Sequence, residues 1–581
     1  MDTIKSFKGY GKVDPAEEQA FRRKTRKRII ILTVSVVLLL AVIIGAVAGT
    51  LIHKRNKNND DSTVGSNSSA QSLKAVCSQT LYPESCYNSI SEMNKSNSTD
   101  PEELLKLSLQ VVLKSLSDVA TLPDKLGSKT TNQTVKMALG VCGTVLNDAV
   151  EYLQDCLSEM DVKPNEKLLT LPKVEDLKTW LSTAITNQET CIDALDEMSP
   201  NSTFVDDTKS QMKNSTEYAS NSLAIVSKIA GILRKLNINF HRKMLTVTVT
   251  EQGFPEWVSP GVRRLLQEVR PTPNVTVAAD GSGDVRTIKE AMAMVTKKSK
   301  SVFIIYIKEG VYKENVVLDK SFWNVMIYGD GKTKSIVSGG LNFIDGTPTF
   351  STATFAVAGR GFVAMDMGFI NTAGPEKHQA VAFRSGSDFS VFYRCSFDAY
   401  QDTLYPHSNR QFYRECDVTG TIDFIFGNAA VVFQNCKIMP RQPMANQFVT
   451  ITAQGKKDPN QNTGISIQKC DISAFDQLTA PTYLGRPWKE FSTTVIMQSN
   501  IGAFLKPQGW ISWVSGVDPP ESIFYGEYMN TGDGANVGQR VKWAGYRPSL
   551  TSSDANRFTV ANFIEGAMWL PQTTVKFEST L

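Results

Sequence analysis

Two aspartates in the C-terminal half of the chain stand 21 residues apart in similar surroundings. Asp402 lies in Tyr400-Gln-Asp-Thr-Leu404, and Asp423 opens Asp423-Phe-Ile-Phe-Gly427. If the spacing places them on neighbouring turns of a repeating structure, the two carboxylates face one groove. Like charges that close resist joint ionisation, so one pKa rises and the pair can divide into a proton donor and a nucleophile. This arrangement predicts acid–base ester hydrolysis, with two carboxylates that merely cap turns as the alternative.

The elements that would position these aspartates are short β-prone runs between Asn274 and Leu581. Four of the runs end alike, each in a cysteine followed two residues later by an apolar residue. These cysteines are Cys395, Cys416, Cys436 and Cys470, and the first intervals are 21 and 20 residues. Such a repeat predicts the coils of a parallel β-helix. Stacked strands lie about 4.8 Å apart, a Cα separation that a disulfide tolerates, so we expect the pairs Cys395–Cys416 and Cys436–Cys470.

Residues 73–235 follow a different period. Apolar residues recur there at three- or four-residue spacing, which marks the buried faces of helices and predicts a helical bundle. One such face comprises Ala138, Val141, Cys142, Val145, Ala149, Tyr152 and Cys156, and the next comprises Leu177, Trp180, Leu181, Ala184, Gln188, Cys191 and Leu195.

The N-terminus has the features of a membrane-targeting segment. Residues 1–28 hold nine Lys or Arg, and residues 29–52 are 24 residues without a charge. As a helix this run extends about 36 Å, which crosses a bilayer core, and the positive-inside bias predicts a type II signal anchor with a cytosolic tail. A signal peptide cleaved near Ala46-Val47-Ala48 is the alternative. The clustered basic residues therefore indicate targeting rather than binding to nucleic acid.

Two further features indicate the secretory pathway for the rest of the chain. All nine cysteines follow the apolar run, as do seven N-x-S/T sequons. A Ser- and Asn-rich stalk spans 53–72, and a linker spans 236–273, where Arg263-Arg264-Leu265-Leu266 is a candidate processing site. The predicted glycosylation sites are Asn67, Asn94, Asn97, Asn132, Asn201, Asn214 and Asn274.

Five segments in the C-terminal half occur in the order of the signatures of the plant pectin methylesterases. They are Gly310-Val-Tyr-Lys-Glu314, Gln379-Ala-Val-Ala382, Tyr400-Gln-Asp-Thr-Leu404, Asp423-Phe-Ile-Phe-Gly427 and Leu484-Gly-Arg-Pro-Trp488. Residues 274–581 therefore resemble this family, which implies a right-handed parallel β-helix. Residues 73–235 resemble the plant invertase and pectin methylesterase inhibitors. The second resemblance implies a four-helix-bundle pro-domain with the disulfides Cys77–Cys86 and Cys142–Cys191. Cys156 falls outside that pattern, and we expect a free buried thiol.

The resemblance also implies roles for individual residues. Asp423 would attack the ester carbonyl, and Asp402 would protonate departing methanol and then activate water. Gln379 and Gln401 would donate to the oxyanion. The residues expected to bind substrate are Thr349, Gln379, Arg486 and Trp488, with Arg486 on free galacturonate carboxylates and Trp488 stacked on a sugar ring.

The predicted reaction converts methyl-esterified homogalacturonan to pectate and methanol in the cell wall, without a metal or other cofactor. Expected partners are separate pectin methylesterase inhibitor proteins and a subtilisin-like protease that recognises Arg263, Arg264, Leu265 and Leu266 and cuts after Leu266. We expect the pro-domain to cap the groove until that cut.

Other functions fit less well. The chain has four His and no G-x-S-x-G segment, which disfavours a Ser-His-Asp esterase. A pectin lyase would need a calcium-binding carboxylate cluster, and a polygalacturonase a different carboxylate set. A wall-binding protein with an inactive groove remains the rival of another class.

Overall fold

The computed structural model describes residues 64–93, 100–161, 170–200, 202–237, 271–573 and 575–581. The chain divides into Met1–Asn67 and Ser68–Leu581, and the fold below is that of the second unit. The predicted cytosolic tail, the apolar run at 29–52 and the processing site at Arg263–Leu266 lie outside the described residues. Within those ranges no helix combines the length and apolar character needed to cross a membrane.

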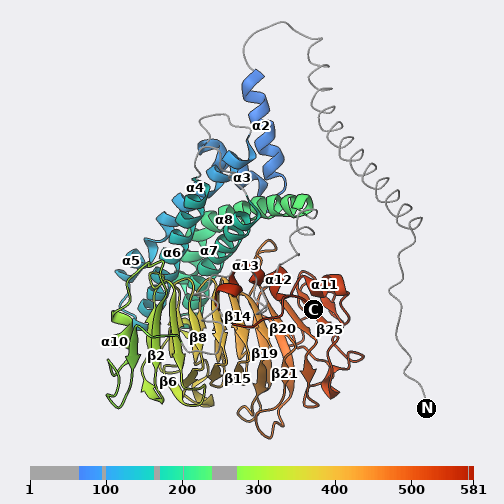
Figure 1. Cartoon of the computed structure of the whole chain (residues 1–581). Helices are drawn as coiled ribbons and strands as arrows, with labels where there is room; N and C mark the ends of the chain where they lie inside the picture. Colours follow the sequence, from blue (N-terminus) through green and yellow to red (C-terminus); the bar gives the residue numbers. More distant parts are fainter. Residues whose placement is uncertain (1–63, 94–99, 162–169, 201, 238–270, 574) are drawn as a thin grey trace, which may run out of the picture. The chain divides into compact units, whose positions relative to one another are not determined.

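The first part of the described chain is helical, as predicted (Figure 1). The four long helices α4, α6, α7 and α8 form the bundle: α6 packs on α4 and α7, and α8 packs on α4 and α7. Local sequence sets several helix starts, since Asp100 and Asn132 accept hydrogen bonds from the first free N–H groups of α4 and α6. The helices are α2 (Val64–Cys77), α3 (Pro83–Met93), α4 (Pro101–Val119), α5 (Leu122–Gly127), α6 (Gln133–Met160), α7 (Leu171–Met198) and α8 (Thr203–Asn237).

Helix α7 differs from its neighbours because it is buried on two sides. Its apolar face, with Leu177, Leu181 and Leu195, joins the bundle core as the periodicity predicts. Its other face carries short polar side chains that are buried as well, among them Thr183 and Thr186. These polar side chains contact the β-structured part of the chain. Helices α6 and α8 contact it too, for example through Tyr152 and Ser220.

The rest of the described chain is a parallel β-helix, which confirms the predicted class. Three sheets run its length, and every named strand pair is parallel, so successive coils stack in register. The eleven-stranded sheet contains β1 (Val275–Val277), β2 (Phe303–Ile307), β5 (Val325–Gly329), β8 (Val363–Met365), β11 (Ser390–Tyr393), β14 (Arg410–Arg414), β17 (Ala430–Gln434), β20 (Gly464–Gln468), β23 (Thr493–Met497), β25 (Phe524–Tyr528) and β26 (Tyr546–Arg547).

The other two sheets complete each coil. The eight-stranded sheet contains β3 (Gly310–Lys313), β6 (Ser335–Gly339), β9 (Gly368–Asn371), β12 (Ser396–Asp398), β15 (Asp417–Gly420), β18 (Lys437–Pro440), β21 (Asp471–Ile472) and β24 (Asn500–Ile501). The seven-stranded sheet contains β4 (Val316–Leu318), β7 (Phe355–Val357), β10 (Phe383–Ser385), β13 (Leu404–Pro406), β16 (Ile425–Gly427), β19 (Val449–Gln454) and β22 (Thr482–Pro487).

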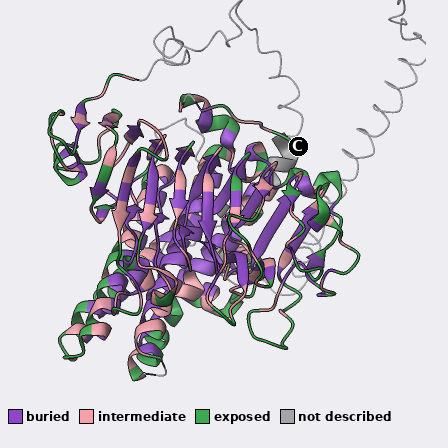
Figure 2. Cartoon of the chain, turned by 90° about the horizontal axis from the view of Figure 1, so that it is seen from below, coloured by how far each residue is buried: buried purple, intermediate pink, exposed green. Residues whose placement is uncertain are grey.

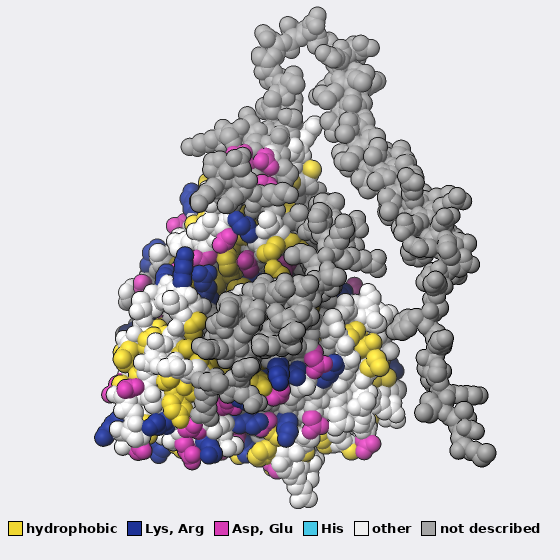
Figure 3. Space-filling view, in the orientation of Figure 1, with side chains coloured by type: hydrophobic (Ala, Val, Ile, Leu, Met, Phe, Trp, Pro, Cys, Tyr) yellow, Lys and Arg dark blue, Asp and Glu magenta, His cyan; other side chains and the backbone are white. Residues whose placement is uncertain are grey.

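The core of the β-helix is a column of stacked rings. Equivalent positions on successive coils lie one above another, so Phe392, Tyr413 and Phe433 stack with centroids 4.4 and 4.6 Å apart. Figure 2 shows buried residues along the strands and exposed residues mainly in the connecting loops. Short helices near the strand ends are α10 (Ile288–Ala293), α11 (Ser552–Asn556), α12 (Val560–Phe563) and α13 (Gly566–Trp569). On the face drawn in Figure 3, acidic and basic side chains are interspersed.

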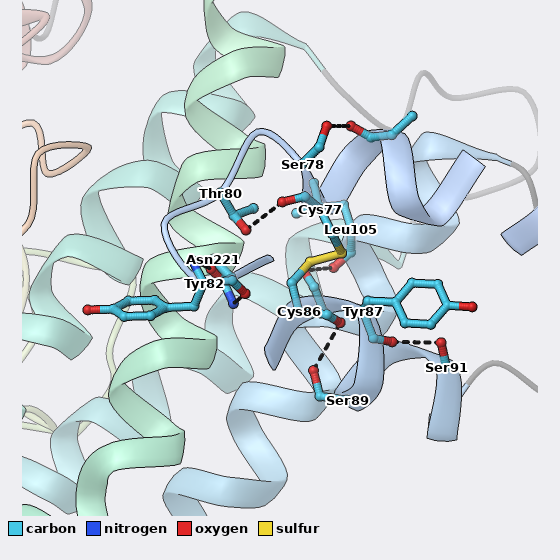
Figure 4. Close-up of a disulfide and its surroundings, with 12 residues drawn as sticks. Cys77, Ser78, Thr80, Tyr82, Cys86, Tyr87, Ser89, Ser91, Leu105 and Asn221 are labelled. Carbon is cyan, nitrogen blue, oxygen red and sulfur yellow. Dashed lines mark hydrogen bonds between the residues drawn. A yellow bond between two sulfur atoms is a disulfide. The ribbon is translucent and has the colours of Figure 1, made fainter. Parts of the chain in front are cut away.

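The two disulfides of the helical part form as the family resemblance implies. Cys77 pairs with Cys86 between α2 and α3, and Cys142 pairs with Cys191 between α6 and α7. Figure 4 shows the first bond and the loop that it closes, where the Asn221 side chain of α8 hydrogen-bonds the backbone N–H and C=O of Tyr82. Cys156 is a buried free thiol, as expected.

The predicted disulfides Cys395–Cys416 and Cys436–Cys470 are wrong for this structure, in which all four cysteines are buried free thiols. The four do stack on neighbouring coils, because the flanking strands pair Ser396 with Asp417 and Asp417 with Lys437. In a parallel in-register ladder the side chains run side by side, so the Cβ atoms stay about as far apart as the strands, near 4.8 Å. A disulfide prefers Cβ atoms about 3.8 Å apart.

Candidate active site

The two aspartates occupy equivalent positions on neighbouring coils, as their spacing predicts. Strands β13 and β16 pair Leu404 with Ile425, which places Asp402 and Asp423 two residues earlier on each coil. Both have left-handed backbone conformations, with φ of 63° and 52°, which short polar residues tolerate best after glycine. Both residues are buried, with 7 and 5% of their surface exposed. The turn before each strand therefore presents both carboxylates to one cavity.

Asp423 is held from two sides. From β22, the Arg486 guanidinium donates from Nη2 to Oδ2 at 2.6 Å and from Nε to Oδ1 at 2.9 Å. From β19, the Thr450 hydroxyl donates to Oδ1 at 2.6 Å and accepts from the Asp423 N–H at 2.9 Å. Charge-assisted pairs of this kind are short and directional, so they fix the orientation of the carboxylate. The sequence did not single out Thr450, because threonine is common in β-strands.

Arg486 was expected on a galacturonate carboxylate, and the structure places it elsewhere. Its guanidinium is occupied by Asp423 and lies 4.2 Å from the Trp513 ring centroid. Only 16% of its side chain is exposed. The fork of a guanidinium fits one carboxylate at a time, so in this state Arg486 orients Asp423 instead of offering an open anion site.

Asp402 has an environment that favours its protonated form. Burial raises its pKa well above the ordinary value, the carboxylates of Asp423 and Glu197 raise it further, and Arg486 opposes them. A neutral carboxylic acid such as Asp402 can donate a proton. Asp423 differs because it is paired with the Arg486 guanidinium. The surroundings thus distinguish the two carboxylates, since one is favoured in its neutral form and the other is paired with a cation.

Gln379 and Gln401 line the same cavity. Gln379 lies one coil before Asp402, and Gln401 lies one coil before Asp423. The backbone N–H of Ala380 donates to the carbonyl of Gln401, which brings the two glutamines to adjacent levels of the stack. Within the described residues neither side-chain amide is engaged in a hydrogen bond. Both amides are therefore available to donate to an oxygen that becomes negatively charged between them and the aspartates.

Aromatic rings form one wall of the cavity, which has a volume of about 480 Å³. Trp488 lies 6.3 Å from Trp513 with the rings nearly parallel, and 6.3 Å from Phe426. Gly455 makes room for it, since a Cβ there would lie 2.8 Å from Cε3 of Trp488. Aromatic faces at a groove suit the C–H faces of sugar rings.

Helix α7 forms another part of the cavity wall. Asp193 and Glu197 of this helix line the cavity together with Thr190, Ala194 and Asp196. Glu197 accepts hydrogen bonds from the backbone N–H of Thr349 at 3.1 Å and from its hydroxyl. Thr349 was expected to bind substrate, and here it binds the helical domain instead. Along the helix alone, Asp193 and Glu197 look like part of an exposed face. The sequence therefore did not predict that they line the cavity.

Lys489 continues this contact along the helix. Its Nζ lies 2.5 Å from Oδ1 of Asp193 and 3.7 Å from Oε2 of Glu189. Burial lowers the pKa of Lys489, but the two carboxylates outweigh it and the pKa stays above its ordinary value. Burial raises the pKa of Glu197 to about 6, against the hydrogen bonds from Thr349.

A second set of polar contacts anchors α7 beyond the cavity. The Arg410 side chain, 2% exposed, pairs with Asp388 of its own domain at 2.7 Å and with Asp176 of α7 at 2.7 Å. The Trp180 indole N–H donates to Asp388 at 3.2 Å. Buried polar groups need partners, and here each domain satisfies those of the other. The helical domain therefore packs on the β-helix through specific polar contacts as well as at the cavity.

The remaining predicted sites lie on the surface or outside the described residues. Asn132, Asn214 and Asn274 are exposed, and Asn132 and Asn274 use their side-chain oxygens to accept backbone hydrogen bonds. Asn94, Asn97 and Asn201 lie outside the described ranges, as does the side chain of Asn67. In the described part of the chain no cluster of His, Cys, Asp or Glu has the arrangement of a metal site.

Comparison with known proteins adds to this geometry. Residues 274–567 match a family model described as pectinesterase, and residues 71–225 match one described as plant invertase/pectin methylesterase inhibitor. The chain is 61% identical to pectinesterase 1 of Arabidopsis thaliana over 99% of both chains. It is 58% identical to pectinesterase 3 of Phaseolus vulgaris over 100% of both. The solved pectin methylesterase from carrot matches with a TM-score of 0.53 and 51% identity, covering 54% of this chain and 100% of that one.

Proposed function

Because this chain belongs to the pectinesterase family and hydrolyses the methyl esters of pectin, we propose that it does so through an acyl-enzyme on Asp423. In the first step Oδ of Asp423 attacks the ester carbonyl carbon. The bond to the methoxy oxygen breaks, and the proton of Asp402 passes to that oxygen to give methanol. In the second step water gives a proton to Asp402 and its hydroxide to the acyl carbon. The bond to Asp423 then breaks, and the galacturonic acid leaves.

The observation that carries this proposal is the unequal environment of the two carboxylates. Asp423 has a fixed cation and a hydroxyl donor, whereas Asp402 is buried with a raised pKa. One group can serve as acid in the first step and as base in the second, as microscopic reversibility requires. The free amides of Gln379 and Gln401 would stabilise the oxyanion in both steps, and one such donor contributes about 3 kcal/mol.

The test is methanol release from highly methylated pectin by the cut protein, with Asp423→Ala as the matched variant. We expect release by the wild type and none by the variant, although both still bind pectin. If the wild type binds pectin but releases no methanol across pH and salt, the proposal is overturned in favour of a wall-binding protein with an inactive groove.

We further propose that the helical domain is autoinhibitory. Its α7 closes one side of the cavity, and its carboxylates occupy Thr349 and Lys489. A polymer cannot lie in a groove that is occupied in this way. Cleavage at Arg263–Leu266 by a subtilisin-like protease would free the groove for pectin, and also for separate inhibitor proteins. The uncut chain should be much less active than the cut and dissociated chain, and equal activity would contradict this proposal.

The proposed site of action is the plant cell wall, reached through the secretory pathway. This rests on the apolar run at 29–52 with its basic flank, and on the sequons that follow it. If residues 29–52 are an anchor, the precursor resists extraction from membranes by alkaline carbonate. If the sequons are glycosylated, the electrophoretic mobility of the precursor shifts on deglycosylation. An extractable precursor that begins near Ala48 would replace the anchor with a cleaved signal peptide.

A further inference from the structure

Lys489 lies in the cavity wall and has no assigned role. Of the described residues that line the cavity, Arg486 and Lys489 are the cationic ones. Arg486 is occupied by Asp423, a residue of the same domain. The carboxylate partners of Lys489, Asp193 and Glu189, come from α7, with Glu490 adding only a more distant attraction. When α7 leaves the groove, Lys489 therefore loses the anions that contact it, and Arg486 does not.

The position of Lys489 suits an anionic sugar. It follows Trp488 directly, and its Nζ lies 5.1 Å from the Trp488 ring centroid. Its side chain is 17% exposed with α7 in place, so the ammonium is partly buried in this state. An ammonium in such a place needs a partner, because a partly buried unpaired charge is unfavourable.

Helix α7 shows what kind of partner fits. Glu189, Asp193 and Glu197 stand four residues apart and so lie along one line on the helix, about 6 Å between successive Cα atoms. The line runs over the groove from Lys489 to Thr349. Carboxylates at regular intervals along a chain are also what a hydrolysed stretch of the substrate presents, because each hydrolysed unit exposes one. The helix thus places its anions where such a polymer would place its own.

We propose that Lys489 is a specificity-determining residue that binds a free galacturonate carboxylate close to the ester under attack. This inference rests on the proposed function of the same groove. A fully esterified stretch leaves the ammonium unpaired, whereas a stretch with one hydrolysed unit at that subsite pairs with it. The enzyme therefore favours esters beside units that it has already hydrolysed. A hydrogen bond to a charged group is stronger than one to a neutral group. The difference is enough to give about tenfold discrimination between the two kinds of stretch.

The experiment uses the β-helix part, residues 271–581. The solved carrot enzyme matches this fold over its whole length while covering 54% of this chain, so the fold forms there without a helical domain. Two defined oligogalacturonides are compared at low salt, one fully methylated and one with a single free carboxylate near the ester. The ratio of kcat/KM for the two substrates is measured for wild type, Lys489→Gln and Lys489→Arg. Lys457→Gln is the matched control, since Lys457 pairs with Glu490 and does not line the cavity.

We expect the wild type to prefer the substrate with the free carboxylate, and Lys489→Gln to reduce that preference about tenfold. Lys489→Arg should restore most of it, because the charge returns, and added salt should weaken the wild-type preference. The control should keep the wild-type ratio, and thermal unfolding checks that each variant is folded. A wild type without preference, or an unchanged ratio in Lys489→Gln, overturns the inference. Failure of the proposed function is distinct, since it abolishes methanol release from both substrates.

Discussion

The ion pair between Asp193 and Lys489 provides a direct test of autoinhibition. The perturbation is Asp193→Asn in an uncut full-length chain, in which Arg263 and Arg264 are replaced by Ala to block processing. The substitution keeps the shape of the side chain and removes its charge, so Lys489 loses its nearest anion, 2.5 Å away. The residues that the β-helix contributes to the groove are unaltered, because Asp193 belongs to the helical domain.

The magnitude follows from the exposure of the pair. Exposed ion pairs contribute less than about 1 kcal/mol, and hydrogen bonds to buried charged groups about 1.5–3 kcal/mol. The two side chains are 17 and 29% exposed, so this pair falls between those ranges, at about 1.5 kcal/mol. The docked state is weakened by that amount, which corresponds to about tenfold more undocked enzyme. The rate of methanol release by the uncut chain should rise about tenfold.

The assay compares uncut and cut protein for wild type, Asp193→Asn and the control Asp207→Asn, an exposed acid of α8. The cut and separated enzymes should all be equally active, and the control should behave as wild type before cutting. If Asp193→Asn leaves the uncut activity unchanged while cutting still activates the wild type, α7 does not inhibit through this contact. If cutting activates neither, the groove is not closed by the helical domain at all.

Three further results are expected. Burial in the docked state raises the pKa of Glu197 to about 6. The docked state therefore binds this proton more tightly than the undocked state. Docking strengthens as pH falls below about 6 and weakens above it. The ratio of cut to uncut activity should be several times larger at pH 5 than at pH 7, and Glu197→Gln should flatten it; a ratio that rises with pH would contradict the assignment. Thr450→Ala removes a hydroxyl donor to Asp423 and should lower kcat at least tenfold, whereas Thr450→Ser should retain activity; equal rates would refute its orienting role. Replacing Cys142 and Cys191, 49 residues apart, should destabilise the helical domain by about 4 kcal/mol on a loop-entropy basis, and replacing Cys77 and Cys86 by about 2.6 kcal/mol; thermal unfolding with the order reversed would count against that account.

Local pattern was a good guide wherever structure repeats. The period of the apolar residues predicted the bundle faces of α6 and α7, because a helix buries every third or fourth residue. The 21-residue interval predicted the register of Asp402 over Asp423, because equivalent positions of a β-helix stack one coil apart. The same reasoning failed for the disulfide between Cys395 and Cys416, because stacked side chains keep their Cβ atoms about as far apart as the strands, near 4.8 Å.

Periodicity and spacing did not predict which residues contact each other across the domain boundary. Thr183 and Thr186 look like an exposed helix face until Asn409 and Asn428 of the β-helix bind them. Arg486 matched a substrate-binding position in its motif, but β22 lies only two strands from β16 in the sheet, with β19 between them, and the Arg486 side chain reaches the carboxylate of Asp423.

The sequence by itself determined the two fold classes, their order and the pair of aspartates, because hydrophobic period and repeat length act along the chain. Only the tertiary structure decided which groups contact each other across the groove. Those contacts join Asp423 to Arg486 and Thr450, and Lys489 to the carboxylates of α7. The physical reason is that electrostatic partners and buried polar contacts depend on distance in space, which stacking of distant coils and docking of a separate domain create.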